Sequence, residues 1–154
     1  MSPLEGAWLW LFPFPYLVHI LEESFAGERF DVWIRRVIRR SLSPRMFLTL
    51  NALFIIAMTA AIAALRAGHA PWLLPALGTI TTLNGLGHAA GTIATRRCSP
   101  GLLSGVLLWL PLGIAALTAS VRMLGLGPWL PGVAAGVLAS VVVGLLAFIL
   151  SRRS

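Results

Sequence analysis

Residues 16–23 read Tyr-Leu-Val-His-Ile-Leu-Glu-Glu and close an apolar segment with three ionisable side chains, those of His19, Glu22 and Glu23. On an α-helix, residues three and four positions apart share one face. The imidazole and the two carboxylates are therefore expected to point at one spot. Asn84 and His88 form a second polar pair, four residues apart in another apolar segment.

The composition identifies what surrounds these residues. Of the 154 residues, 58% are hydrophobic and 11% are charged, whereas a soluble domain carries about 25% charged residues. The apolar runs have roughly the 20 residues that a helix needs to cross the hydrocarbon layer. We therefore predict an all-α membrane protein in which residues 1–154 form one integral membrane domain. Its transmembrane helices are expected at about 7–23, 45–65, 73–95, 102–123 and 132–150. Proline removes a backbone donor, so we expect Pro13 and Pro15 to kink or break the first helix, Pro111 to kink the fourth, and residues 125–131 to form a turn.

Residues 28–40 have a different pattern. Five apolar residues recur at the spacing of one helix face, and arginines fill most of the other positions. This pattern predicts an interfacial amphipathic helix, beside the five transmembrane helices, that lies on the membrane surface. Anionic lipid head groups are expected partners, at about 1 kcal/mol for each Arg near the surface.

The arginines also predict the orientation of the chain. All twelve basic residues are Arg, and the five-span topology places ten of them on one side and only Arg66 and Arg122 on the other. Cytoplasmic loops carry the excess of basic residues, so we expect the N-terminus outside and the C-terminus in the cytoplasm. The arginines flank apolar segments instead of forming one soluble basic face, which argues against nucleic acid as a partner. Glu5 stands where a signal peptide would carry a basic residue, so we expect the first span to be retained.

This topology brings the two polar motifs to the same depth. His88 precedes the basic loop that begins at Arg96 by eight residues, which is about 12 Å along a helix. His19 lies at a similar distance from the end of the first span. Both motifs therefore fall in the inner half of the bilayer, where we expect them to meet.

The residues permit two kinds of chemistry at that spot. No carboxylate follows Asp31, so the groups available within the membrane are few: His19, Glu22, Glu23, Asn84, His88 and Tyr16. In the first mechanism the two imidazoles and one or both glutamates hold a single Zn²⁺ or Fe²⁺, which leaves a position open for water or substrate. In the second no metal binds, and paired His and Glu act as general acid and base. Asn84 would orient His88 or the substrate.

These groups favour a membrane-embedded enzyme that acts on an apolar or lipid-like substrate, with metal-dependent hydrolase-like or acid–base isomerase- or cyclase-like chemistry. Two other classes stay open. A proton-coupled carrier or transporter would use the same side chains as binding or relay groups. A non-catalytic assembly protein would use His and Asn only to bridge helices, and could form a homo-oligomer through a stripe of small residues that recur every four positions: Gly132, Gly136, Ser140 and Gly144.

The motifs also resemble a known family. The string His19-Ile-Leu-Glu22-Glu23, followed by Asn84-Gly-Leu-Gly-His88 and then Pro100-Gly101, is similar to the pattern of small bacterial integral membrane proteins named for their His-x-x-Glu-Glu motif. That family pairs the motif with a later Asn-x-x-x-His and a Pro-Gly, for which Pro131-Gly132 is a second candidate here. The resemblance implies a membrane enzyme in a bacterial inner membrane and the same site residues, and it names no reaction.

Overall fold

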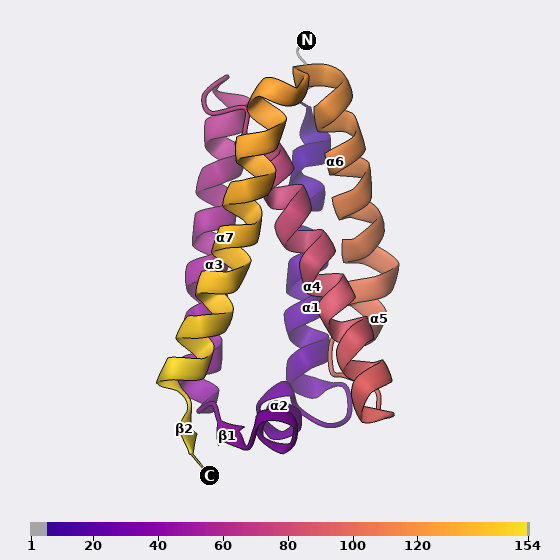
Figure 1. Cartoon of the computed structure of the whole chain (residues 1–154), viewed down its shortest axis with the longest axis vertical. Helices are drawn as coiled ribbons and strands as arrows, with labels where there is room; N and C mark the ends of the chain where they lie inside the picture. The colour runs from indigo at the N-terminus through magenta and orange to yellow at the C-terminus, as the bar shows by residue number, and fades with distance from the viewer. Residues whose placement is uncertain (1–5, 154) are drawn as a thin grey trace.

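The computed structural model describes residues 6–153, and of residues 152 and 153 only the backbone. Glu5, and with it the expectation for the N-terminal end, lies outside the described residues. The chain is almost wholly helical, as predicted, and the elements follow one another in this order (Figure 1): the 3-10 helix η2 (Ala7–Leu11), α1 (Pro13–Phe25), α2 (Phe30–Ile38), β1 (Arg40–Ser41), α3 (Pro44–Arg66), α4 (Leu73–Thr95), α5 (Leu102–Ser104), the π-helix η3 (Gly105–Trp109), α6 (Leu110–Leu124), α7 (Leu126–Leu150) and β2 (Arg152–Arg153).

The long helices run along the long axis of the molecule, and α2 lies across one end of it (Figure 1). Three of them are long and apolar enough to cross a membrane: α3, the continuous run Leu102–Leu124 made of α5, η3 and α6, and α7. The 13 residues of α1 are fewer than the roughly 20 that a membrane crossing needs. The 23 residues of α4 are long enough, but threonines, Asn84 and His88 interrupt their apolar character.

Proline and serine set the helix starts near the predicted positions. Ser43 accepts a hydrogen bond from the backbone N–H of Met46, and Pro44 takes the first helical position of α3. At the N-terminal end the backbone changes from the 3-10 helix η2 to α1 at Phe12, just before Pro13. The predicted interruption of the first apolar segment by its prolines is therefore confirmed.

One predicted boundary is wrong. Residues 125–131 were expected to form a turn, but α7 begins at Leu126 and contains Pro128 and Pro131. Pro128 lies in the first turn, where the backbone N–H groups have no acceptor within the helix and a missing donor costs nothing. Only Pro131 removes a helical hydrogen bond, so the helix continues through it to Leu150.

The small residues of α7 pack inside the chain. A Cβ atom at Gly136 would meet Thr79 Cβ at 2.6 Å and the carbonyl oxygen of Ala76 at 2.7 Å, and one at Gly132 would strike Trp72 and Pro75. Both glycines are buried against α4, whereas a Cβ at Gly144 would meet nothing within 4 Å. Two of the four residues expected to form a homo-oligomer interface are thus occupied within the monomer.

The amphipathic helix α2 is shorter than the predicted 28–40, and its apolar face rests on the bundle. Trp33 is 5% exposed and lies over α4, where a Cβ at Gly91 would come within 2.7 Å of its ring. Phe30 packs against Phe47 of α3, with ring centroids 5.8 Å apart. After α2, Arg40 donates to the carbonyl oxygens of Phe148 and Ser151 and so ties this end of the fold to α7.

Candidate functional site

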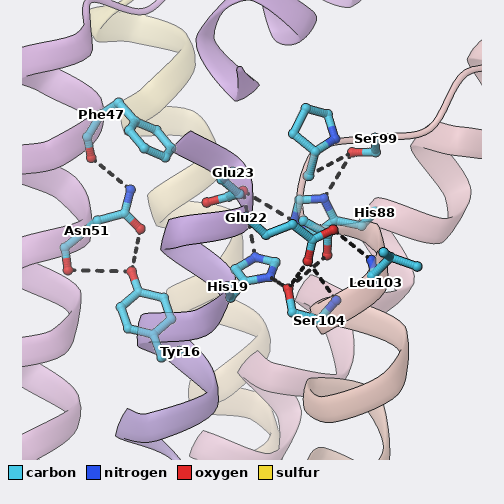
Figure 2. Close-up of polar contacts among 12 residues, drawn as sticks. Tyr16, His19, Glu22, Glu23, Phe47, Asn51, His88, Ser99, Leu103 and Ser104 are labelled. Carbon is cyan, nitrogen blue, oxygen red and sulfur yellow. Dashed lines mark hydrogen bonds and ion pairs between the residues drawn. The ribbon is translucent and has the colours of Figure 1, made fainter. Parts of the chain in front are cut away.

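The two polar motifs meet between α1 and α4, as the sequence predicts (Figure 2). Glu23 Oε1 lies 3.7 Å from His19 Nε2 and 3.5 Å from His88 Nε2. The two imidazole rings are 4.8 Å apart between centroids. His19 is 1% exposed, and Glu23 and His88 are each 6% exposed, so the three groups face one another out of contact with the surroundings.

Two serines fix which nitrogen of each imidazole carries the proton. His19 Nδ1 lies 2.8 Å from Ser104 Oγ, and His88 Nδ1 lies 3.0 Å from Ser99 Oγ. The hydroxyl of Ser104 donates to Glu22 Oε2, and that of Ser99 donates to the carbonyl oxygen of Pro100 at 3.3 Å. In the tautomer that keeps both of these hydroxyl bonds, each serine accepts from an Nδ1–H group. Both Nε2 atoms are then left with a free lone pair, and both face Glu23.

Glu22 has a different position from Glu23. Its carboxylate accepts hydrogen bonds from the backbone N–H groups of Leu103 at 3.0 Å and Ser104 at 2.7 Å, besides that of the Ser104 hydroxyl (Figure 2). These N–H groups belong to the first turn of the helix that starts at Leu102, and Gly101 before it has no side chain to cap them. Glu22 therefore supplies from α1 the carboxylate that a capping residue would supply locally.

Gly101 forms one wall of the site. Its φ of +86° favours glycine, and a Cβ atom there would lie 2.6 Å from His19 Cε1, 2.9 Å from His88 Cε1 and 3.0 Å from Glu23 Cγ. Of the two Pro-Gly candidates in the sequence, Pro100-Gly101 is thus the one that contacts the polar cluster. Pro131-Gly132 packs against Trp72 and Pro75 at the start of α4.

Aromatic rings close the remaining sides. Trp109, at the end of the π-helix η3, stacks on the His19 ring at 5.3 Å with an interplanar angle of 20°. Phe30 of α2 meets the His88 ring edge to face at 6.0 Å. Tyr16 packs on Trp109 and donates a short hydrogen bond to the side-chain oxygen of Asn51. Ring faces therefore pack around the three buried polar groups.

The arrangement of His19, Glu23 and His88 fits a divalent metal ion. Their potential ligand atoms lie within 4.8 Å of one another. Ligand atoms bound at about 2.0–2.2 Å in a tetrahedral site lie about 3.3 Å apart, close to the two nitrogen–oxygen distances observed here. His19 Nε2 is buried and lacks a hydrogen-bond partner among the described residues. A buried imidazole nitrogen with a free lone pair is a ready metal ligand.

The structure places the predicted site residues unequally. It brings His19, Glu23 and His88 together. Glu22 lies outside this group, and Ser104 joins it to His19 by hydrogen bonds to both. Asn84 Oδ1 is buried and without a partner among the described residues, and Ser99 occupies the place beside His88 Nδ1. Ser99 and Ser104 were missed from the sequence, although both lie within four residues of Pro100-Gly101, the third motif of the resemblance.

The comparisons with known proteins agree with the motifs. A family model described as "protein of unknown function with HXXEE motif" matches residues 10–116, which include the site and its walls. No curated protein and no solved structure is a match for the chain. Since the model covers more than half of the sequence, the chain belongs to the HXXEE family.

Proposed function

We propose that this protein is a membrane-embedded metalloenzyme that acts on a lipid-like substrate. In this proposal one divalent ion, Zn²⁺ or Fe²⁺, is held by His19 Nε2, His88 Nε2 and Glu23. When bound, the ion supplies a Lewis acid with a position open for a further ligand. The proposal also includes five membrane crossings, formed by η2 with α1, α3, α4, the run Leu102–Leu124 and α7, with α2 at the interface.

The observation that supports metal binding is the direction of the two imidazole rings. Ligating histidines generally donate their second N–H to an oxygen, which fixes the ring and raises the basicity of the ligating nitrogen. Here His19 donates towards Ser104 and Glu22, and His88 donates towards Ser99 and the Pro100 carbonyl. Both rings are therefore held with their remaining nitrogens towards Glu23.

Glu22 is the group of the cluster that reaches the surface of the bundle. It is half-buried and lies in a groove between α1 and the start of the helix Leu102–Leu124. We assign it the proton exchange with the substrate, as general acid or base. Ser104 joins it to His19 through two hydrogen bonds and holds its carboxylate in place.

Metal analysis of the purified protein tests the proposal, and two other ionisable residues, one beside the site and one far from it, provide controls. The wild-type protein is expected to hold one equivalent of Zn²⁺ or Fe²⁺ in detergent, and Glu23→Gln and His88→Ala are expected to lose it. Glu22→Gln should still load one equivalent, about 10–100-fold more weakly, because it alters an outer partner of a ligand. His69→Ala changes an exposed loop histidine and should bind metal like the wild type.

A protein that folds and carries no metal after loading with either ion would contradict the metal centre. One observation then favours a second candidate, a proton-coupled carrier: a polar path runs from Glu23 through His19 and Ser104 to Glu22. Substrate uptake into metal-free proteoliposomes that is lost in Glu22→Gln would support the carrier.

A further inference from the structure

Beside the polar cluster, a shallow open groove runs between α1 and the first turns of the helix Leu102–Leu124. Its volume is about 580 Å³, within the range of about 300–1,000 Å³ that small-molecule sites occupy. The walls are apolar and include Val18 and Leu21 of α1 and Leu107 of η3. Glu22 and Ser104 are the ionisable and hydroxyl groups of its lining.

We propose that this groove binds a neutral single-chain amphiphile whose polar end is one hydrogen-bond donor, of the chemical class of a long-chain alcohol. The polar end is placed against Glu22 and Ser104, and the chain lies between α1 and η3. This inference rests on the proposed function, for which it supplies the substrate class and the route of entry.

The hydrogen bonds of Glu22 determine which polar group the ligand can carry at its end. A carboxylate offers about four acceptor positions. The chain fills three of them, with the N–H groups of Leu103 and Ser104 and the hydroxyl of Ser104. The remaining acceptor position can take one donor from the ligand, which a terminal hydroxyl provides.

The charge of the lining excludes anionic ends. No Arg or His is among the described residues that line the groove. Proteins bind phosphate and carboxylate groups with Arg or Lys, so an anionic end placed beside Glu22 would have no counter-charge. The arginines of α2, which could bind anionic head groups, lie outside the lining of this groove.

The apolar walls determine the route by which the ligand enters the groove. Leu21 is 57% exposed and Leu107 is 66% exposed, so both face the space that the hydrocarbon layer fills around a membrane helix. A single chain can therefore enter sideways from the bilayer without leaving the apolar phase. Its polar end then stops at Ser104, one hydrogen bond from the ring of His19.

Photolabelling in vesicles of phosphatidylcholine tests the inference. The probe is a long-chain primary alcohol that carries a diazirine in its chain, compared with the fatty acid and the phosphate monoester of the same chain. We expect the alcohol to label α1 and residues 102–109, and the two anionic probes to label them no more than they label the lipid-facing side of α7. Leu21→Trp, which fills the groove, should lose the labelling, whereas Leu53→Trp, on an equally exposed leucine of α3, should keep it.

Phe25→Arg provides a second variant, which changes the charge of the groove without filling it. Phe25 is one of the lining residues and is 80% exposed, so an arginine there adds the missing cation and should bring in labelling by the fatty acid. Equal labelling by all three probes in the wild type, or unchanged labelling in Leu21→Trp, would overturn the proposal. Metal content measured on the same samples separates the two claims. Alcohol-selective labelling of a protein that binds no metal would support the groove as a binding site and contradict the metal centre.

Discussion

The geometry of the site depends on the absence of a Cβ atom at Gly101. The residue before the helix Leu102–Leu124 has a φ of +86°, and the same residue lies against His19, His88 and Glu23. Any side chain there would have to adopt a left-handed backbone and also displace two imidazoles. The Pro-Gly motif therefore has a physical role, which is to let the helix start directly beside the polar cluster.

Gly101→Ala is expected to destabilise the protein and to abolish metal binding. The left-handed conformation costs about 1–2 kcal/mol for a non-glycine residue, and forcing an extra carbon into a packed site costs about 1–3 kcal/mol. Thermal unfolding in detergent, with metal content measured in parallel, checks both effects. Gly27→Ala is the matched control, because Gly27 has a φ of +87° with nothing within 4 Å of its Cβ position. If the two variants lost equal stability, the contact of Gly101 with the site would be irrelevant.

At this scale the sequence predicts the ionisable residues better than their partners. His19, Glu23 and His88 could be found because ionisable groups are rare in apolar segments and because helix periodicity places them on a face. Ser99 and Ser104 could not be found in the same way, since serine is common in loops and helix starts. The positions of these serines depend on how the loop of residues 96–101 folds back against α4. No periodic pattern in the sequence encodes the path of that loop. Asn84 was selected for its spacing to His88, but Ser99 takes the hydrogen bond.

The helix from Leu102 to Leu124 owes its shape to an irregular segment. In η3 the backbone N–H of Leu110 bonds to the carbonyl of Gly105, five residues back, and Pro111 follows without a donor of its own. Such π-segments are frequent at functional sites. Here the segment ends at Trp109, which is 1% exposed and stacks on His19. A π-segment just before Pro111, where the sequence predicts a kink, thus places a ring against the site.

The helix α2 covers the site through Phe30 and is held against α4 by Trp33, so Trp33→Ala is expected to loosen the helix. Removing a buried Trp side chain costs about 3–5 kcal/mol, which is enough to make undocking of a nine-residue helix frequent. Hydrogen exchange should show faster exchange of the α2 backbone amides, with α3 unchanged. Val37 lies on the same helix and is 42% exposed, so Val37→Ala should exchange like the wild type. Unchanged exchange in Trp33→Ala would mean that the chain connections, and not this contact, hold α2 in place.

The elements that the sequence placed best are those with continuous apolar runs. The expected spans 45–65, 73–95 and 102–123 differ from the observed helices by one residue at most. The start of α7 was misplaced by six residues because two prolines were interpreted as a turn. Proline is compatible with the first turn of a helix, so its presence marks a helix start as well as a break.

For the molecule as a whole, the arginines lie unevenly along its long axis. The end with α2, the loop after α4 and the C-terminal strand carries most of them, and Arg66 and Arg122 lie in the last turns of α3 and α6, towards the other end (Figure 1). In the proposed orientation the arginine-rich end is cytoplasmic, which follows the distribution of basic residues in membrane proteins.

Cys98 offers a direct measurement of this orientation. It is the one cysteine of the chain, it is exposed, and it lies in the loop after α4. A membrane-impermeant maleimide is expected to leave it unlabelled in intact cells and to label it in inside-out vesicles. In a Cys98→Ser background, His69→Cys moves the thiol to the exposed loop at the other end and should reverse the result. Labelling of Cys98 in intact cells would invert the proposed topology.

The bond between Glu22 and the start of the helix at Leu102 joins residues that are made at very different times. Ser104 follows Glu22 by 82 positions, so α1 leaves the ribosome long before the amides and the hydroxyl that its carboxylate binds. His88, the second imidazole beside Glu23, also comes later. Until those segments are synthesised, the newly made N-terminal helix carries three polar groups without their native partners. In the proposed five-span topology, stable residence of this helix in the bilayer therefore depends on synthesis of the chain at least as far as Ser104.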